Sequence, residues 1–261
     1  MSTDLLSLIN VSKRYGGLWA LSGVELAVPR GSIVGLVGPN GAGKTSLFDI
    51  VSGLERPETG QIFLQGRDVT DLPAHARAGL GLARTFQTTQ TFEALDVVEN
   101  VLVGRAGLAW PGVVASGLRT PAVFQQEHAD LVRAFEILDL IGLYDKAGRR
   151  MNQISTVQRK MVAIGRALAM EPELLLLDEP FGGLSQDEAE QMAGLLESIR
   201  GPRTGLLVVD HHIALLGDLA DDLQVLVNGV IHAGGRPDRV LQDRAIAELL
   251  AVPQASEEPG P

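Results

Sequence analysis

Cysteine is absent from the sequence, which excludes a disulfide framework and thiolate ligation of a metal. Long apolar runs are absent too. The longest stretches without Asp, Glu, Lys or Arg are residues 31–43, 106–118 and 223–235, each shorter than the roughly 18 residues that a membrane-spanning helix needs. The N-terminus lacks the basic segment of a secretory signal. We therefore expect a cytoplasmic chain that does not cross a membrane.

Positive charge is scarce as well. The chain has 22 Lys and Arg residues against 32 Asp and Glu residues, and its formal net charge is −10. Nonspecific binding to nucleic acid draws most of its affinity from Lys and Arg, so nucleic acid is not an expected partner. Hydrophobic residues, by contrast, make up 45% of the 261 positions. This composition excludes a disordered or fibrous protein and allows one large or two small domains.

Apolar periodicity predicts strands and helices that alternate along the chain, and this alternation indicates an α/β fold with a parallel sheet. Leu131, Phe135 and Leu138 are expected to face inward on one helix. Asn228-Gly229 predicts a tight hairpin turn. The expected strand regions are 6–28, 33–37, 61–65, 174–177, 205–209, 223–227 and 230–232. The expected helices are 44–52, 127–140, 157–170 and 186–200, the last opened by a capping box of Ser185 and Glu188.

A glycine-rich loop lies between the expected strand 33–37 and the expected helix 44–52. It matches G-x-x-x-x-G-K-[ST], in which backbone N–H groups and a helix N-terminus bind phosphates. Lys44 would reach the β- and γ-phosphates, and the Thr45 hydroxyl would bind Mg²⁺. The alternative is an ordinary glycine-rich turn. The residues expected to contact ATP here are Gly38, Pro39, Asn40, Gly41, Ala42, Gly43, Lys44, Thr45 and Ser46.

A second element of this site is predicted where the strand 174–177 ends in Asp178-Glu179. We expect Asp178 to hold the water shell of the metal and Glu179 to polarise the attacking water. An apolar run ending in two acids is, taken alone, more often a buried strand that reaches solvent. The phosphate loop earlier in the chain favours the catalytic interpretation.

The distance in sequence between Lys44 and Asp178 leaves room for a large insertion in a nucleotide-binding core. From about residue 6 to about residue 250, the chain resembles the ATP-binding cassette (ABC) ATPases. The resemblance implies ATP and Mg²⁺ as ligands. It rests on an aromatic residue at the adenine position, a Q-loop glutamine that also reaches the metal, a signature serine, a D-loop and a switch histidine, which are Tyr15, Gln87, Ser155, residues 182–185 and His211.

Each of the weaker elements has another reading when it is taken alone. Tyr15 would also suit a half-buried strand, and Gln87 would also suit a loop. His211 would also serve as a helix cap or a surface histidine, and His212 beside it competes for the switch position. Their order and spacing around the two stronger motifs favour the ATPase assignment.

The resemblance implies a P-loop NTPase core with a parallel sheet, an N-terminal antiparallel β subdomain and an inserted α-helical subdomain. All of these would belong to one ABC ATPase domain. The expected boundaries are 1–250 for that domain, 1–90 and 171–235 for the core, 91–170 for the helical subdomain with an insertion at 105–126, and 236–261 for a C-terminal helix and disordered tail.

Three segments are similar to the larger ATPase subunit of branched-chain amino acid importers: residues 15–18, 81–87 and 97–104, followed by a long insertion. Relatives of that subunit serve urea and other amides. The resemblance implies a peripheral protein on the cytoplasmic side of the inner or plasma membrane. Its partners would be integral permease subunits, a second ABC ATPase and, indirectly, an external substrate-binding protein. The alternative is a soluble ABC ATPase that regulates or assembles other proteins.

The signature departs from the family pattern Leu-Ser-Gly-Gly-Gln, because this chain has Thr156 and Val157 at the glycine positions. In the family, the serine hydroxyl and the second glycine's N–H donate to ATP held by the partner subunit. A displaced donor there costs about 2.7–4 kcal/mol. Ser185 replaces the usual Asp or Asn of the D-loop. We therefore expect a heterodimer with a paralogue that has an intact signature, in preference to a homodimer of low activity.

The low-charge stretch 106–124, which includes Trp110, has two possible roles. It would contact membrane-embedded partners or the membrane interface, or it would pack as a surface loop on its own subdomain.

Overall fold

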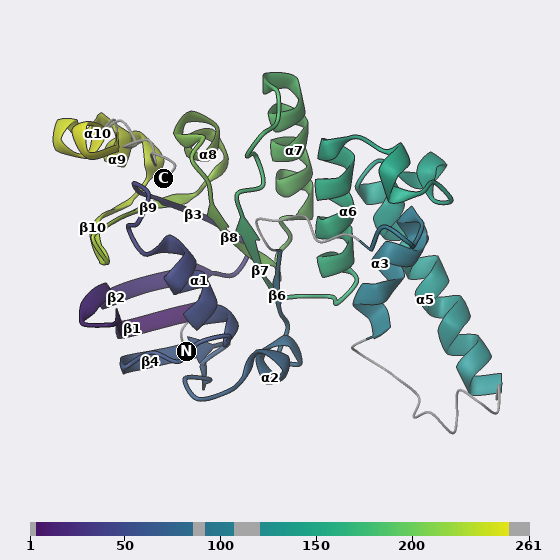
Figure 1. The fold of residues 1–261 in the computed structure, drawn as a ribbon, viewed down its shortest axis with the longest axis horizontal. Coiled ribbons are helices and arrows are strands. Elements are labelled where there is room, and N and C mark those ends of the chain that lie inside the picture. The colour runs from purple at the N-terminus through teal and green to yellow at the C-terminus, as the bar shows by residue number, and fades with distance from the viewer. Residues whose placement is uncertain (1–3, 86–91, 107–120, 251–261) are drawn as a thin grey trace, which may run out of the picture.

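In a computed structural model of the chain, the described residues are 4–85, 92–106 and 121–250. Their strands form two sheets (Figure 1), an antiparallel one with the order β2-β1-β4-β5 and a six-stranded one with the order β10-β9-β3-β8-β7-β6. The strands are β1 (Asp4–Tyr15), β2 (Leu18–Pro29), β3 (Ile33–Val37), β4 (Thr59–Leu64), β5 (Arg67–Asp68), β6 (Leu82–Arg84), β7 (Leu174–Asp178), β8 (Gly205–Val209), β9 (Asp222–Val227) and β10 (Val230–Gly235).

Helices cover both sheets and form a separate group at one side of the molecule (Figure 1). They are α1 (Lys44–Ser52), α2 (Ala74–Ala78), α3 (Val97–Ala106), α5 (Pro121–Leu140), η1 (Tyr144–Lys146), η2 (Met151–Gln153), α6 (Thr156–Leu168), α7 (Gln186–Ile199), α8 (Ile213–Leu219), α9 (Pro237–Gln242) and α10 (Arg244–Leu250). This arrangement confirms the predicted α/β fold with an antiparallel β subdomain and an inserted helical one.

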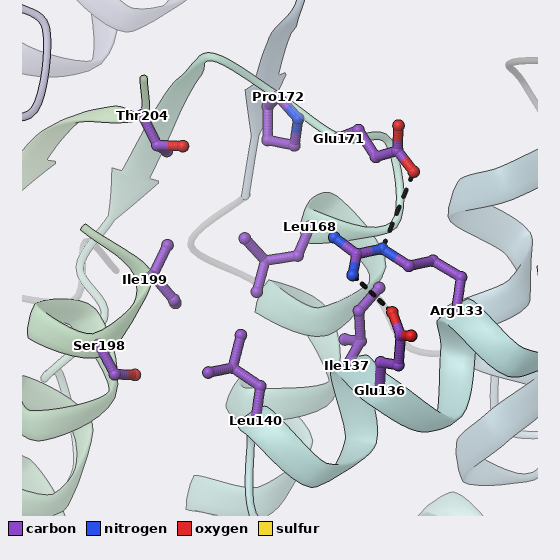
Figure 2. Close-up of a pocket in the computed structure, with 10 residues that line it drawn as sticks. All are labelled: Arg133, Glu136, Ile137, Leu140, Leu168, Glu171, Pro172, Ser198, Ile199 and Thr204. Atoms are coloured by element: carbon purple, nitrogen blue, oxygen red, sulfur yellow. Dashed lines mark hydrogen bonds and ion pairs between the residues drawn. The ribbon is translucent and has the colours of Figure 1, made fainter. Parts of the chain in front are cut away.

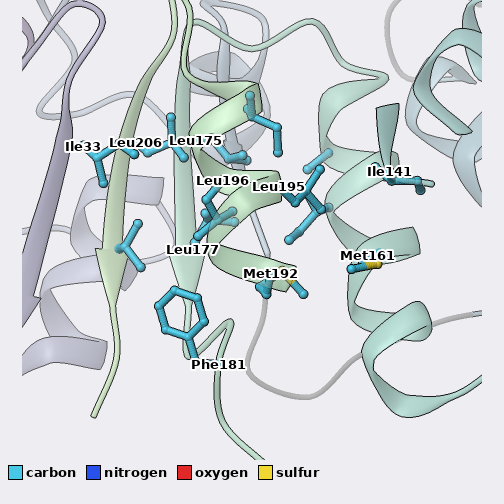
Figure 3. Packing of buried hydrophobic residues seen from close by; sticks show 14 of the residues in the cluster. Ile33, Ile141, Met161, Leu175, Leu177, Phe181, Met192, Leu195, Leu196 and Leu206 are labelled. Carbon is cyan, nitrogen blue, oxygen red and sulfur yellow. The ribbon is translucent and has the colours of Figure 1, made fainter. Parts of the chain in front are cut away.

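The six-stranded sheet is parallel from β9 to β6, and only β10 pairs antiparallel. Every residue of β3 and of β8 is buried, because helices or the other sheet cover both faces of these strands. The larger core lies between this sheet and the helices that follow it. Figure 3 shows Leu175 and Leu177 of β7 directed toward Leu196 and Met192 of α7. The smaller core joins α1 to the antiparallel sheet.

Three hairpins of the described chain, β1-β2, β4-β5 and β9-β10, are closed by two-residue turns with left-handed backbone. Asn228 and Gly229 have φ of 49° and 78°, and Gly16 and Gly17 have φ of 54° and 99°. Positive φ at both central positions is typical of the turn that matches the twist of paired strands. The predicted hairpin at Asn228-Gly229 is confirmed, and so is the capping box that opens α7 at Ser185.

The helical subdomain contains α3, α5 and α6 (Figure 1). Helix α5 begins at Pro121, earlier than predicted, and buries Ala134, Ile137 and Leu138. The prediction that Leu131 faces inward is wrong, since that side chain is 39% exposed. In Figure 1 the first half of α5 extends past the end of α6.

A buried arginine that the sequence analysis did not single out fixes the C-terminal end of α1. Arg77 of α2 is fully buried, and its guanidinium donates to the carbonyl oxygens of Ile50 and Val51 at 2.6 and 2.8 Å. It also donates to the carbonyls of Leu72 and Thr70 at 2.9 and 3.0 Å. The last carbonyls of α1 are therefore satisfied by a side chain.

The C-terminal part of the described chain forms two short helices, α9 and α10, where one helix was predicted. The predicted disordered tail lies outside the described residues from 251 on, and so does most of the predicted insertion, at 107–120. None of the described helices combines the length and the apolar character needed to cross a membrane.

Candidate nucleotide site

The predicted site residues gather at one edge of the parallel sheet. The loop at 38–45 follows β3, Asp178 and Glu179 close β7, and His211 follows β8, which lies between these two strands. Since β3, β7 and β8 run parallel, their carboxyl ends meet at the same edge. Ligands of open α/β sheets bind at this edge. Strand order thus brings together residues that are far apart in the sequence.

The glycines of the loop are required by close backbone approach. A Cβ at Gly43 would lie 2.3 Å from the carbonyl oxygen of Ala20, and one at Gly38 would lie 2.0 Å from that of Leu226. Gly43 caps α1 with φ of 105°, and Gly41 has φ of 76°, both in the left-handed region that favours glycine. The loop is therefore shaped by β2 on one side and β9 on the other.

The Lys44 side chain lies against the phosphate loop, where a nucleotide is expected to bind. Its Nζ donates to the carbonyl oxygens of Gly38 and Pro39 at 2.6 and 2.8 Å, and the residue is only 8% exposed. Burial lowers the pKa of Lys44, while the charges of Glu179 and Asp178 act to raise it. The ammonium thus lies within electrostatic reach of both predicted acids.

Asp178 is neutralised by an arginine. Nη2 of Arg84 donates to Oδ2 of Asp178 at 3.2 Å, while Nη1 donates to Asp49 at 2.6 Å and to Ser52 at 3.1 Å. The side chains of Arg84 and Asp178 are 6% and 9% exposed. Burial raises the pKa of Asp178, and the Arg84 charge opposes that rise. The guanidinium also lies over the ring of Phe48, 5.4 Å from its centroid.

Glu179 and His211 are in direct contact. Nε2 of His211 donates to Oε1 of Glu179 at 2.8 Å. The backbone of Glu179 has φ of 49°, and its N–H donates to the carbonyl of Val209 in β8 at 2.8 Å. Positive φ is uncommon for a residue other than glycine, and it often marks a functional site. The structure therefore brings the predicted base and the predicted switch histidine together.

His212, the competing histidine, has a different partner. Its Nδ1 lies 2.8 Å from Oδ1 of Asp210, a carboxylate that is itself buried. Asp210 also accepts from the backbone N–H of His211 at 2.7 Å, of His212 at 3.0 Å and of Phe181 at 2.8 Å. Asp210 thus joins the segment after β7 to the segment after β8, and the contact with Glu179 belongs to His211.

Tyr15 lies at the end of β1, next to the helix that carries the loop. Its hydroxyl donates to Oε2 of Glu55 at 2.6 Å, and Nζ of Lys13 lies 5.2 Å from the ring centroid. Burial and the hydrogen bond to Glu55 raise the pKa of Tyr15 to about 12, with a smaller opposing contribution from Ser46 in α1. The residue as a whole is 42% exposed, which leaves Tyr15 accessible for stacking.

Ser155 caps the N-terminus of α6, where its hydroxyl accepts from the N–H of Gln158 at 3.4 Å. Thr156 and Val157 are the first helical residues, so neither needs the conformation that favours glycine. Val157 is 5% exposed and packs in the core, whereas Thr156 is exposed. The helix turns the Val157 side chain inward, away from the surface on which Ser155 and Thr156 lie.

A cleft elsewhere on the molecule contains none of the predicted site residues. Figure 2 shows it between α5 and α6 on one side and the end of α7 on the other, with Arg133 bonded to Glu136 at 2.7 Å. It also includes Pro172 and Thr204, which precede β7 and β8. The cleft is therefore at the amino edge of the sheet, away from the phosphate loop.

Magnesium fits the donors at the carboxyl edge. Among the described residues, no three or more His, Asp or Glu side chains form a group that would hold a metal without help. Mg²⁺ commonly takes one or two protein oxygen ligands and completes its shell with water and substrate phosphates. The hydroxyl of Thr45 and the carboxylate of Asp178 are oxygen donors of this kind and would hold the ion. The predicted third ligand, Gln87, lies outside the described residues.

Comparison with known proteins decides the family. The family described as ABC transporter matches residues 21–182. This chain belongs to the ABC transporter family. The ABC ATPase is 34% identical to the high-affinity branched-chain amino acid transport ATP-binding protein LivG of Salmonella typhimurium over 241 residues, which cover 92% of this chain and 94% of LivG. It is 32% identical to the lipopolysaccharide export system ATP-binding protein LptB of Acidithiobacillus ferridurans over 95% of this chain and 96% of LptB.

A solved structure supports the same assignment for the fold. The crystal structure of the ADP conformation of an ATP-binding cassette from an ABC transporter superposes with a TM-score of 0.84 at 28% identity, covering 95% of this ABC ATPase and 98% of that chain. Family membership means that this ABC ATPase hydrolyses ATP and that the hydrolysis is coupled to transport.

Three residues of the site did not stand out in the sequence of this ABC ATPase. Arg84 precedes the expected Q-loop, Lys160 follows the signature, and Asp210 directly follows β8. Arg84 and Asp210 had a local signal, since each is a charged residue at the end of an apolar strand, whereas Lys160 had none. No signal identified the partner of any of them, because those partners lie on other elements.

Proposed function

We propose that this ABC ATPase is the energy-supplying subunit of an importer for branched-chain amino acids or related small amides and urea. It would act at the cytoplasmic face of the membrane, with integral permease subunits and, through them, an external substrate-binding protein. The similarity to LivG over most of the chain supports this cargo class. The similarity to LptB shows that closely related ATPases serve other cargo, so specificity would be set by the partner chains.

The contact between Glu179 and His211 is the observation that carries the hydrolytic part of the proposal. Glu179 would take the proton of the attacking water, and His211 would hold the carboxylate until a γ-phosphate competes for its Nε2. Lys44 would exchange its two loop carbonyls for phosphate oxygens. Bound Mg²⁺ would neutralise phosphate charge. Tyr15 would stack on adenine, since its ring is accessible and its hydroxyl is already bonded.

We further propose that the second ATPase subunit is a paralogue. Dimerisation is general among ATPases of this family. Thr156 is exposed at the position where the family places a glycine, and the Ser185 hydroxyl is bonded to Oε2 of Glu188 at 3.1 Å. Both features support a weak signature surface on this chain. The N-terminus of α6 still has the backbone N–H groups of its first turn and the positive end of a helix dipole, both of which favour an anion there.

Glu179→Gln tests the hydrolytic role. The substitution keeps the shape of the side chain and removes its basic charge, so ATP should bind at parental affinity while turnover becomes very slow. It should also trap the closed dimer, which sedimentation detects. Glu190→Gln, an exposed position on α7, is the matched control and should hydrolyse normally. Parental turnover in Glu179→Gln would show that another base acts.

A deletion strain tests the cargo and the partners. Cells that lack the chain are given the parent or the Glu179→Gln variant, and uptake of labelled leucine, urea and an unrelated sugar is measured. The parent should restore leucine or urea uptake, and the variant should restore neither. Purification of the tagged parent from detergent-solubilised membranes should yield hydrophobic permease subunits and a paralogous ATPase. If the tagged parent purifies from the solubilised membranes without any other protein, the importer assignment is refuted.

A further inference from the structure

Lys160 reaches from the signature helix into the turn that carries the predicted base. It lies in α6, and its Nζ donates to the carbonyl oxygens of Glu179 at 2.9 Å, Pro180 at 3.2 Å and Gly182 at 2.7 Å. An ammonium group has three donors and no acceptor. All three donors of Lys160 are therefore committed to one short segment, directly after β7.

The backbone of Glu179 needs such support. Its φ of 49° is a conformation that persists only where the surroundings hold it. On the amide side, the N–H of Glu179 is bonded to Val209 in β8, and on the carbonyl side the oxygen is bonded to Lys160. Between these two anchors, the side chain contacts His211. The carbonyl oxygen of Glu179 also accepts from the N–H of Gly182 at 3.3 Å, so β8, Lys160 and the turn itself together hold this backbone.

The net effect of its surroundings is to lower the pKa of Lys160, and two nearby carboxylates partly oppose that effect. Burial lowers its pKa, whereas the negative charges of Asp210 and Glu179 act to raise it. Asp210 binds the N–H of Phe181, within the same segment whose carbonyls Lys160 binds. A carboxylate and an ammonium therefore hold the amide and carbonyl groups of one turn. An apolar side chain at position 160 would leave the carbonyls without this donor.

We propose that Lys160 is a positioning residue that fixes the backbone of Glu179 and couples the signature helix to the hydrolytic site of the same chain. The inference rests on the proposed role of Glu179. Ser155 caps the N-terminus of α6, on the surface expected to meet ATP held by the partner subunit. A displacement of α6 during dimer closure is transmitted through the Lys160 ammonium to the carbonyl of Glu179. The displacement changes the orientation of the Glu179 carboxylate.

The test compares Lys160→Met, Lys160→Gln and Lys160→Arg with Lys146→Met, which removes an ammonium from η1 in the same subdomain. Each tagged full-length variant is purified from the membranes of cells in which it replaces the parent, in whatever assembly it forms. Turnover at saturating Mg-ATP, KM, ATP affinity and the thermal unfolding midpoint are measured. Misplacing a reacting group by about 1 Å costs about a hundredfold, so Lys160→Met should lower kcat ten- to a hundredfold.

The expected pattern separates positioning from a general loss of structure. KM and ATP affinity should stay within about twofold of the parent in Lys160→Met, because the phosphate loop is untouched. Lys160→Arg should recover most of the turnover, and Lys160→Gln, which keeps donors without charge, should lie between Met and Arg. Lys146→Met should behave as the parent. The Gln and Arg variants give the same comparison if Lys160→Met does not fold.

Several results would overturn the inference. Parental kcat in Lys160→Met or Lys160→Gln would show that the ammonium does not position Glu179. Equal losses of kcat and ATP affinity, or no recovery in Lys160→Arg, would show a structural role only. Parental turnover in Glu179→Gln would refute the proposed role of Glu179. Parental turnover in the Lys160 variants, with slow turnover in Glu179→Gln, would refute only the role of Lys160.

Discussion

Val157→Gly restores the residue that the ABC family has at this position, yet we predict that it destabilises the chain. The Val157 side chain is 5% exposed and packs in the larger core. Removing its three carbons costs about 2.4 kcal/mol at ~0.8 kcal/mol per buried carbon. Glycine in a helix adds ~0.5–1 kcal/mol through backbone entropy. The free energy of unfolding should therefore fall by roughly 3 kcal/mol.

Urea unfolding followed by far-UV circular dichroism measures this loss. The midpoint should fall while the slope stays constant, because the surface exposed on unfolding hardly changes. Thr156→Gly is the matched control: its side chain is exposed, so the loss should stay below about 1 kcal/mol. A loss below 1 kcal/mol in Val157→Gly, or equal losses in both variants, would refute the assignment of Val157 to the core. Thr156→Gly is consequently the better variant for restoring a signature surface.

Three further predictions concern the loop and the helix behind it. Lys44→Ala should weaken ATP binding at least tenfold, roughly 1.4 kcal/mol, in a calorimetric titration, and unchanged affinity would contradict the assigned phosphate contact. Gly43→Ala should abolish measurable ATP binding because its Cβ would lie 2.3 Å from the Ala20 carbonyl oxygen. Gly41→Ala, which has open space at the Cβ position, should lose less than tenfold, and equal losses would refute the steric reason. Arg77→Met should lower the free energy of unfolding by about 3 kcal/mol or more in urea, since buried carbonyls lose their donor, and a loss under 1 kcal/mol would contradict it.

The sequence predicted the bounds of an element correctly where the local residue pattern alone determines the local structure. Residues 33–37 and 44–52 were predicted with the bounds that β3 and α1 have, because a buried parallel strand is a continuous apolar run and Gly53 ends the helix. Asp178, Glu179 and His211 were predicted one by one. Their meeting at one edge depends on strand order, which the resemblance implied and the paired strands show.

The sequence pattern could not predict the contacts of charged residues whose partners are distant in the sequence. Arg77 sits in a short polar helix that reads as a surface segment, and only the fold shows it buried under α1. Lys160 has the spacing of an ordinary exposed helical lysine. The error at Leu131 was the reverse: an apolar residue that was expected to be buried is exposed. Apolar periodicity does not show how far the neighbouring helices extend along α5. Burial of single side chains is a property of tertiary packing.

The hairpin between β9 and β10 has a consequence for synthesis of the chain. The N–H of Gly229 donates to the carbonyl of Ala42 in the phosphate loop at 2.9 Å, and the carbonyl of Gly229 accepts from Ser22 at 2.8 Å. During translation, the loop therefore emerges long before the turn that braces it. A nascent chain that has passed α1 but not Gly229 holds an incompletely supported nucleotide loop. Tight nucleotide capture on the ribosome thus has to wait until the last strands of the sheet are released.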